Sequence, residues 1–199
     1  GDITTTADNI SFLRAVTLAG AVALNSAGGG ILFSNTVDGG SNLTLTAGGG
    51  NITFTGIVGG GTRLGVLTVN SVATWTATGI SAGSISRVAG TVLDTFNGAL
   101  DTNGALGIAL TATAVTINST VNTTGTGVMT VTNGGLLTIA AAGDMTLDGA
   151  FTQNGAGAVS TAGDITTTAD NISFLRAVTL TGAVALNSAG GGILFSNTV

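Results

Sequence analysis

The chain of 199 residues contains no proline, cysteine, histidine, tyrosine, lysine or glutamate. Without cysteine it can form neither disulfides nor thiolate metal sites. Without histidine or cysteine it cannot build the Ser-His or Cys-His pairs of nucleophilic enzymes, and aspartate is the only carboxylate left to act as a base. The absence of proline is typical of strands that are paired on both edges, because a residue without an N–H interrupts the ladder of hydrogen bonds.

Charge is also scarce, since only 7% of the residues are charged and nine aspartates against four arginines give a net charge of −5. Nucleic acids and anionic membranes are bound by clustered lysine and arginine, so we expect neither as a partner. The sequence has no signal-peptide pattern and no run of 18 apolar residues, so we expect no membrane insertion. The hydrophobic content of 44% nevertheless exceeds that of disordered chains and predicts a buried core.

One passage of the sequence occurs twice. Residues Gly1–Val37 return as Gly163–Val199 with 36 identities in 37 positions, and only Ala19 against Thr181 differs. We interpret this offset of 162 residues as a tandem duplication. Residues 1–162 are then one full repeat unit, and residues 163–199 are the start of the next, near-identical unit in a continuous solenoid without a linker.

Aromatic residues recur at a constant step of 21 in the first half of the chain. We predict that they form an inward-facing structural ladder, which the second copy continues. The predicted ladder consists of Phe12, Phe33, Phe54, Trp75, Phe96, Phe174 and Phe195. A second apolar column is expected four residues further on, at Val16, Val37, Val58, Gly79, Leu100 and Val121.

Around these markers apolar and polar residues alternate, as in Ile10-Ser11-Phe12 and Ile52-Thr53-Phe54. A period of two with one apolar set predicts short strands that are buried on one side. Glycine-rich stretches between them are typical of turns. The sequence therefore predicts an all-β fold, a parallel β-helix (β-solenoid) of about seven coils per 162-residue repeat, rising roughly 34 Å. An all-β sandwich is the alternative, but it does not require the step of 21.

Three kinds of ligand chemistry are conceivable. Paired aspartates, namely Asp2 with Asp8, Asp94 with Asp101, and Asp144 with Asp148, could serve a polysaccharide-cleaving groove, but aspartate beside glycine more often caps turns. The aspartates are too sparse for a calcium cage, so we expect no metal site. Thr-x-Thr triplets suggest an ice-binding face, although the same positions hold other residues on several expected coils.

Turns written "AGG" or "AGD", and stretches such as "LTLTAGGGNITF" and "LLTIAAAGDMTLDG", resemble the repeat regions of large secreted bacterial surface proteins of the filamentous-haemagglutinin and autotransporter type. The resemblance lies in composition and rhythm along the whole chain. It implies a right-handed coil, export to the bacterial cell surface and a role in a stalk or fibre. It supplies no binding residues.

The sequence therefore predicts a structural extracellular fibre or adhesin stalk, with copies of itself along or beside the fibre as partners. The alternative is an adhesin module that binds carbohydrate, such as a surface polysaccharide, through a Thr/Asn-rich outer face. We expect no enzymatic activity, no catalytic residues and no cofactor.

Overall fold

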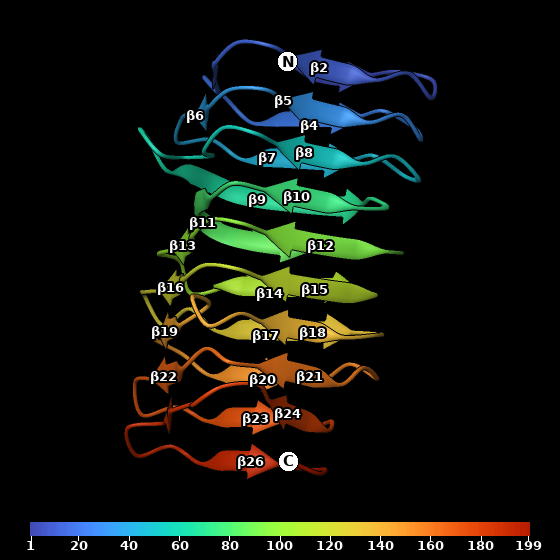
Figure 1. The fold of residues 1–199 in the computed structure, drawn as a ribbon. Helices are drawn as coiled ribbons and strands as arrows, with labels where there is room; N and C mark the ends of the chain where they lie inside the picture. The colour runs from blue at the N-terminus through green and yellow to red at the C-terminus, as the bar shows by residue number, and fades with distance from the viewer.

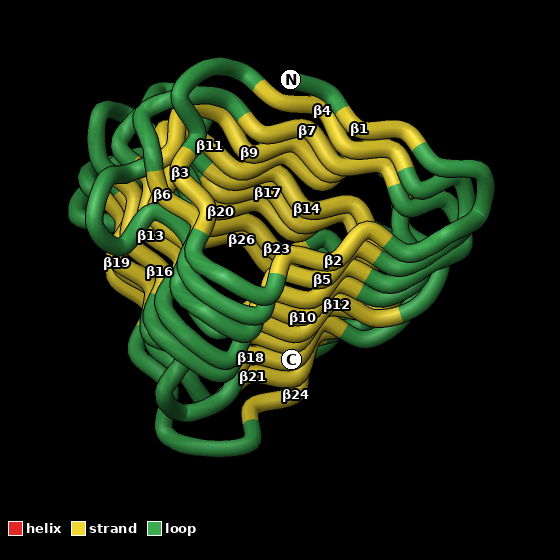
Figure 2. The backbone as a smooth tube through the Cα atoms, turned by 90° about the horizontal axis from the view of Figure 1, so that it is seen from above, coloured by secondary structure: helices red, strands yellow, loops and turns green.

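The computed structural model describes all 199 residues as short strands joined by turns, without any helix. No helical segment is therefore available to cross a membrane. The strands lie one above another in a single column (Figure 1). Viewed from the N-terminal end, the strands occupy three sides of a roughly triangular outline, and the chain runs clockwise as it recedes (Figure 2). The protein is thus a right-handed parallel β-helix, as predicted.

We number the three sides in the order in which the chain visits them. Face 1 is a nine-stranded sheet of β2 (Ile10–Phe12), β5 (Ile31–Phe33), β8 (Ile52–Phe54), β10 (Trp75–Ala77), β12 (Leu93–Phe96), β15 (Ala114–Ile117), β18 (Leu137–Ile139), β21 (Val159–Thr161) and β24 (Val178–Leu180). Face 2 holds β3 (Val16–Thr17), β6 (Val37–Asp38), the start of β11 (Ile80–Arg87), β13 (Leu100–Thr102), β16 (Val121–Thr123), β19 (Met145–Leu147), β22 (Ile165–Thr167) and β25 (Leu186–Asn187). Face 3 holds β1 (Ile3–Thr4), β4 (Val22–Asn25), β7 (Leu43–Thr46), β9 (Leu64–Ser71), the end of β11, β14 (Ile108–Ala112), β17 (Met129–Asn133), β20 (Phe151–Gln153), β23 (Ile172–Phe174) and β26 (Ile193–Phe195).

Faces 2 and 3 form one continuous sheet because β11 turns the corner between them. Its first residues, from Ile80, pair with β13 on face 2, and its last residues, up to Arg87, pair with β14 on face 3. Every pairing between strands is parallel, so each coil is bonded to the coils before and after it. Adjacent coils are separated by about 4.8 Å, the usual spacing of paired strands.

The alternating pattern places one set of side chains inside, where 41 buried hydrophobic residues form a single core. Each inward position stacks on the equivalent position of the next coil, as Ile10 does on Ile31 and Ile31 on Ile52. Polar residues of the same strands, such as Thr53, point outward. Burial of these apolar columns, at about 25 cal/mol per Å², is the main force that holds the coils together.

The predicted aromatic ladder is divided in the structure. Phe12, Phe33 and Phe54 stack nearly parallel, with ring centroids 4.9 and 5.0 Å apart. Phe96 belongs to the same column, but Ala77 occupies the position between Phe54 and Phe96. Trp75 lies two residues earlier, above Ile52, because the coil from Ile52 to Trp75 is two residues longer than the step of 21. Its ring meets that of Phe96 edge-on at 5.0 Å, and Ala77 leaves room for this contact.

Phe174 and Phe195 do not continue the ladder of Phe12 at all. They lie on β23 and β26 of face 3, where Phe174 stacks on Phe195 at 5.3 Å and also contacts Phe151, which the sequence analysis had left out. The expectation of one seven-residue aromatic column is therefore wrong. The reason is that the second copy of the sequence is wound onto different faces from the first.

The second predicted column lies on face 2 with one substitution. Val16, Val37 and Val58 stack as expected, but the next position is Ile80 rather than Gly79. The longer coil before Trp75 accounts for this offset. The column then continues through Leu100 to Val121.

Glycine is required where coils approach most closely at a corner. A Cβ on Gly98 would lie 1.4 Å from the carbonyl oxygen of Thr78 in the preceding coil, so no other residue fits there without moving the backbone. The corner of the "NSAGGG" turn has a different requirement, since Ala27 and Gly28 both take positive φ, at 50° and 118°. Such turns let the chain change direction within a few residues.

Candidate functional surface

The outward middle position of face 1 carries a nearly continuous row of hydroxyl groups. Successive coils place these residues directly above one another in the register of the sheet. Leu32 is the one member without a hydroxyl. The row, which we call the hydroxyl ladder, consists of Ser11, Leu32, Thr53, Thr76, Thr95, Thr116, Thr138, Ser160 and Thr179.

The hydroxyl ladder is more regular than the sequence analysis had concluded. A constant step of 21 had paired Thr53 with Thr74, whereas the structure pairs Thr53 with Thr76 because of the longer coil between them. The same shift brings Thr76 beside Thr95. Five consecutive coils, from β8 to β18, thus carry threonine at this position, with hydroxyls spaced about 4.8 Å apart.

Amides and further hydroxyls flank this ladder toward the corner with face 2. Asn118 donates from Nδ2 to Oδ1 of Asn97 at 2.9 Å, so the two amides are linked along the column. Thr78 instead turns its hydroxyl to the carbonyl oxygens of Phe54 and Thr55, at 3.1 and 3.0 Å. The central coils of face 1 are therefore polar over two adjacent positions, and they carry no charge there.

A shallow depression of about 190 Å³ lies at the N-terminal end of the hydroxyl ladder. It is bordered by Asn9 and Asn51 on one side and by Ser11 and Thr53 around Leu32. Oδ1 of Asn9 is already occupied by the N–H of Gly30 at 2.7 Å. The depression offers hydroxyl and amide groups around an apolar floor, which is chemistry suited to a sugar ring rather than to an ion.

A larger apolar hollow of about 280 Å³ lies at the N-terminal end of the column and is lined by core residues, among them Ile3, Phe12 and Val16. The copies of these residues in the second unit are Ile165, Phe174 and Val178. All three copies are buried, at 0, 0 and 4% exposure, beneath the coil that precedes them. The hollow is therefore the open end of the core and not a ligand site.

The aspartates serve mainly to join neighbouring coils. Five of them accept a hydrogen bond from a backbone N–H in an adjacent coil, at 2.7 to 3.0 Å, and these are Asp2, Asp38, Asp144, Asp148 and Asp164. This use of the carboxylate at turns is the interpretation that the sequence analysis favoured.

The three candidate aspartate pairs do not form a common groove. Asp94 is buried in the core, whereas Asp101 points outward on face 2, where it pairs with Arg63. Asp144 and Asp148 bond in opposite directions, to the following and the preceding coil. Asp2 binds the N–H of Ala23, and no group of three carboxylates lies together as a metal site would require.

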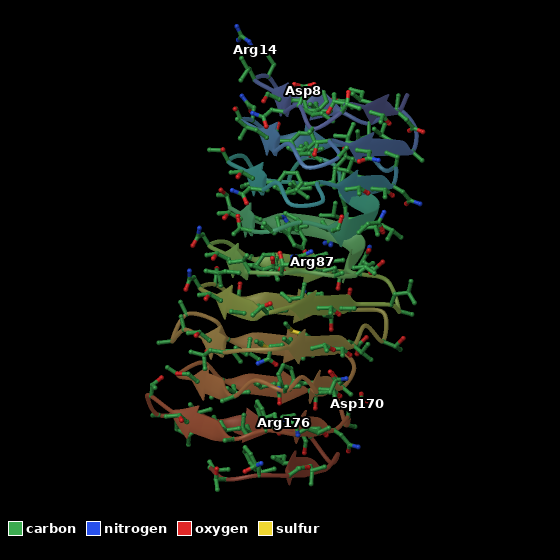
Figure 3. All side chains as sticks on the ribbon, turned by 90° about the vertical axis from the view of Figure 1, so that its right-hand side faces the viewer. Asp8, Arg14, Arg87, Asp170 and Arg176 are labelled. Carbon is green, nitrogen blue, oxygen red and sulfur yellow. The ribbon has the colours of Figure 1, made fainter.

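The most unusual group in the molecule is an ion pair inside the core, in the middle of the column (Figure 3). Arg87 donates from Nε and Nη2 to the two carboxylate oxygens of Asp94, at 2.8 and 3.1 Å, and both side chains are fully buried. The remaining guanidinium hydrogens bond the carbonyl oxygens of Val72 and Ala89. The pair joins face 3 to face 1 across the core.

Burial raises the pKa of Asp94 above its usual value, while the hydrogen bonds and charge of Arg87 act in the opposite direction. The two residues interrupt apolar columns, because Arg87 lies between Val69 and Leu110 and Asp94 lies between Trp75 and Val115. The sequence analysis recognised Asp94 only as a break in the alternation. Its one useful signal was an arginine seven residues earlier, on a chain with four arginines in all.

Comparison of the chain with protein-family models, curated proteins and solved structures finds no match. The functional argument therefore depends on the column, its walls and its buried groups.

Removing one member of the buried ion pair should destabilise the protein far more than removing both. Arg87→Leu leaves an unpaired carboxylate in the core and should lower the free energy of unfolding by about 3–5 kcal/mol. The double replacement Arg87→Leu with Asp94→Val restores both apolar columns and should recover most of that loss. Urea titrations of the parent, both single variants and the double variant measure this. A double variant as unstable as the sum of its singles would contradict the expectation.

Proposed function

We propose that this chain is part of a structural fibre or adhesin stalk outside a bacterial cell. The observation that carries the proposal is that one uninterrupted stack continues from the first unit into the second. β22 and β23, which begin the second copy, pair with β19 and β20 in the same way as any other neighbouring coils. A column of this kind transmits length along one axis, because each coil contacts only its neighbours.

The distribution of polar groups supports the same proposal. The carboxylates are used for bonds between coils and for two ion pairs, so they contribute to cohesion. The interior is filled by one continuous core along the column. Such a design maximises bonding along the axis, which is the direction in which a stalk is loaded.

The proposed stalk should lengthen without thickening when units are added. A chain extended by one complete 162-residue copy should grow by about 37 Å, since a copy winds through nearly eight coils of about 4.8 Å. Small-angle scattering of the parent and the extended chain gives both the length and the cross-sectional radius. An unchanged length with a wider cross-section, or two compact bodies joined flexibly, would contradict a continuous stalk.

Lateral association with sister chains is part of the proposal. The walls carry few charges to keep the fibres apart, and single leucines protrude from the corners, with Leu13 and Leu106 exposed by 71 and 74%. Apolar groups of this size gain free energy when another surface covers them.

The mass measured by light scattering should therefore rise with concentration, and Leu106→Asp should reduce that rise. The matched control is Ile57→Asp, which adds the same charge at another exposed apolar position, 49% exposed. A constant monomer mass at the highest attainable concentration would refute lateral association.

The hydroxyl ladder favours a second function, binding of a polysaccharide by the wall of the stalk. Sugar polymers present hydroxyls at regular intervals, and face 1 presents threonine hydroxyls, the amides of Asn97 and Asn118, and the depression around Leu32 on a single side. Uncharged hydroxyls and amides can donate and accept hydrogen bonds with such a polymer at many positions.

Replacing the ladder should abolish such binding without unfolding the column. Thr76, Thr95, Thr116 and Thr138 changed together to valine keep their β-branched shape and lose only their hydroxyls. The matched control changes Thr44, Thr68, Thr130 and Thr152, the equivalent outward row of face 3. In sedimentation with insoluble polysaccharides, the face 1 variant should bind at least about tenfold more weakly, a loss of about 1.4 kcal/mol. Equal loss in both variants, or no binding by the parent, would argue for a passive stalk.

A further inference from the structure

The two copies of the repeated sequence lie on different faces of the column. In the first copy, Ile10–Phe12 forms β2 on face 1 and Val16–Thr17 forms β3 on face 2. In the second copy, the corresponding residues form β23 on face 3 and β24 on face 1. Every segment of the second copy is thus displaced by one face, against the direction in which the chain winds.

The displacement can be counted along one column of face 3. Starting at Ile3, the eighth coil-to-coil step reaches Phe174, and the column consists of Ile3, Leu24, Leu45, Val69, Arg87, Leu110, Val131, Gln153 and Phe174. The copy of Ile3, however, is Ile165, which lies one face earlier, on face 2. The 162 residues therefore wind eight turns less one face. With three faces to a turn this is 23 segments of about seven residues each.

The local structure of each segment is the same on both faces. Ser26 donates to the carbonyl oxygen of Gly29 at 2.5 Å, and its copy Ser188 donates to that of Gly191 at 2.6 Å. The φ angles of Ala27 and its copy are 50° and 49°. The rings of Phe12 and Phe33 are inclined by 11° and those of their copies by 7°. A segment therefore carries its own strand and corner, and it fits more than one side of the triangle.

From these observations we infer that successive 162-residue units are rotated by a third of a turn about the fibre axis. Because 23 is not a multiple of three, a surface defined by one segment faces a new direction in each unit and returns to its first direction only in the fourth. A partner that recognises that segment, such as a neighbouring copy of this fibre, then meets the same chemistry on all three sides.

The labelled charges illustrate the consequence. Arg14 projects at the corner between faces 1 and 2, whereas its copy Arg176 lies at the corner between faces 3 and 1, below Asp8 (Figure 3). Asp170, the copy of Asp8, lies at the third corner, at the right-hand edge of the view. Exposed groups are thus distributed around the fibre instead of forming a single charged stripe.

The rotation can be tested with cysteine pairs, because the chain has no cysteine of its own. Thr152→Cys with Ser173→Cys places two thiols on neighbouring coils of face 3, and Ser160→Cys with Thr179→Cys does so on face 1. Paired strands at about 4.8 Å lie within the Cα separation of about 4.4–6.8 Å that a disulfide needs. Ser160→Cys with Ser173→Cys is the matched control, since these residues would be neighbours only if the second unit repeated the faces of the first.

Each pair is examined by disulfide formation under mild oxidation and by excimer emission after labelling with pyrene maleimide. The first two pairs should couple in both measurements, and the third should couple in neither. Coupling of residue 160 with residue 173, or a failure of residue 152 to couple with residue 173 in both measurements, would overturn the rotation.

Discussion

Parallel hydrogen bonding of each short strand to the coils before and after it is the interaction on which the whole molecule depends. A strand of three residues cannot hold its shape alone, but here it is bonded along both edges and its inward side chains rest on those of its neighbours. This requirement explains the absence of proline, since a missing N–H would interrupt the bonding of two coils at once. It also explains the glycines at tight corners, where the backbone of one coil nearly touches that of the next.

The unit of this architecture is the segment, one strand with its corner, and not the whole coil. Coils vary in length, from 19 residues between Trp75 and Asp94 to 23 between Ile52 and Trp75. Two segments of identical sequence nevertheless keep their dihedral angles and hydrogen bonds on different faces. A duplication can therefore extend the column whenever it contains a whole number of segments. It need not contain a whole number of turns, and this one does not.

The same distinction separates what could be predicted from the sequence from what could not. Alternation of apolar and polar letters correctly predicted the buried and outward sides of strands such as β8, because it depends only on the local geometry of a strand. The step of 21 correctly aligned Phe12, Phe33 and Phe54 while the coils kept their length. It failed at Trp75, where one longer and one shorter coil compensate, and at Phe174, where a repeat of segments was taken for a repeat of turns. The contact of Arg87 with Asp94 could not be predicted, since it crosses the core between two faces.

The division of labour between the two sides of each strand bears on the function. Inward positions are constrained by stacking, and even the buried ion pair must satisfy its donors within the core. Outward positions such as those of the hydroxyl ladder contact only their vertical neighbours and solvent, so their chemistry can change while the column persists. Binding properties can therefore evolve on the wall of a stalk without cost to its cohesion. Because the winding distributes each segment's surface over three directions, such a property would belong to the fibre as a whole and not to one side of it.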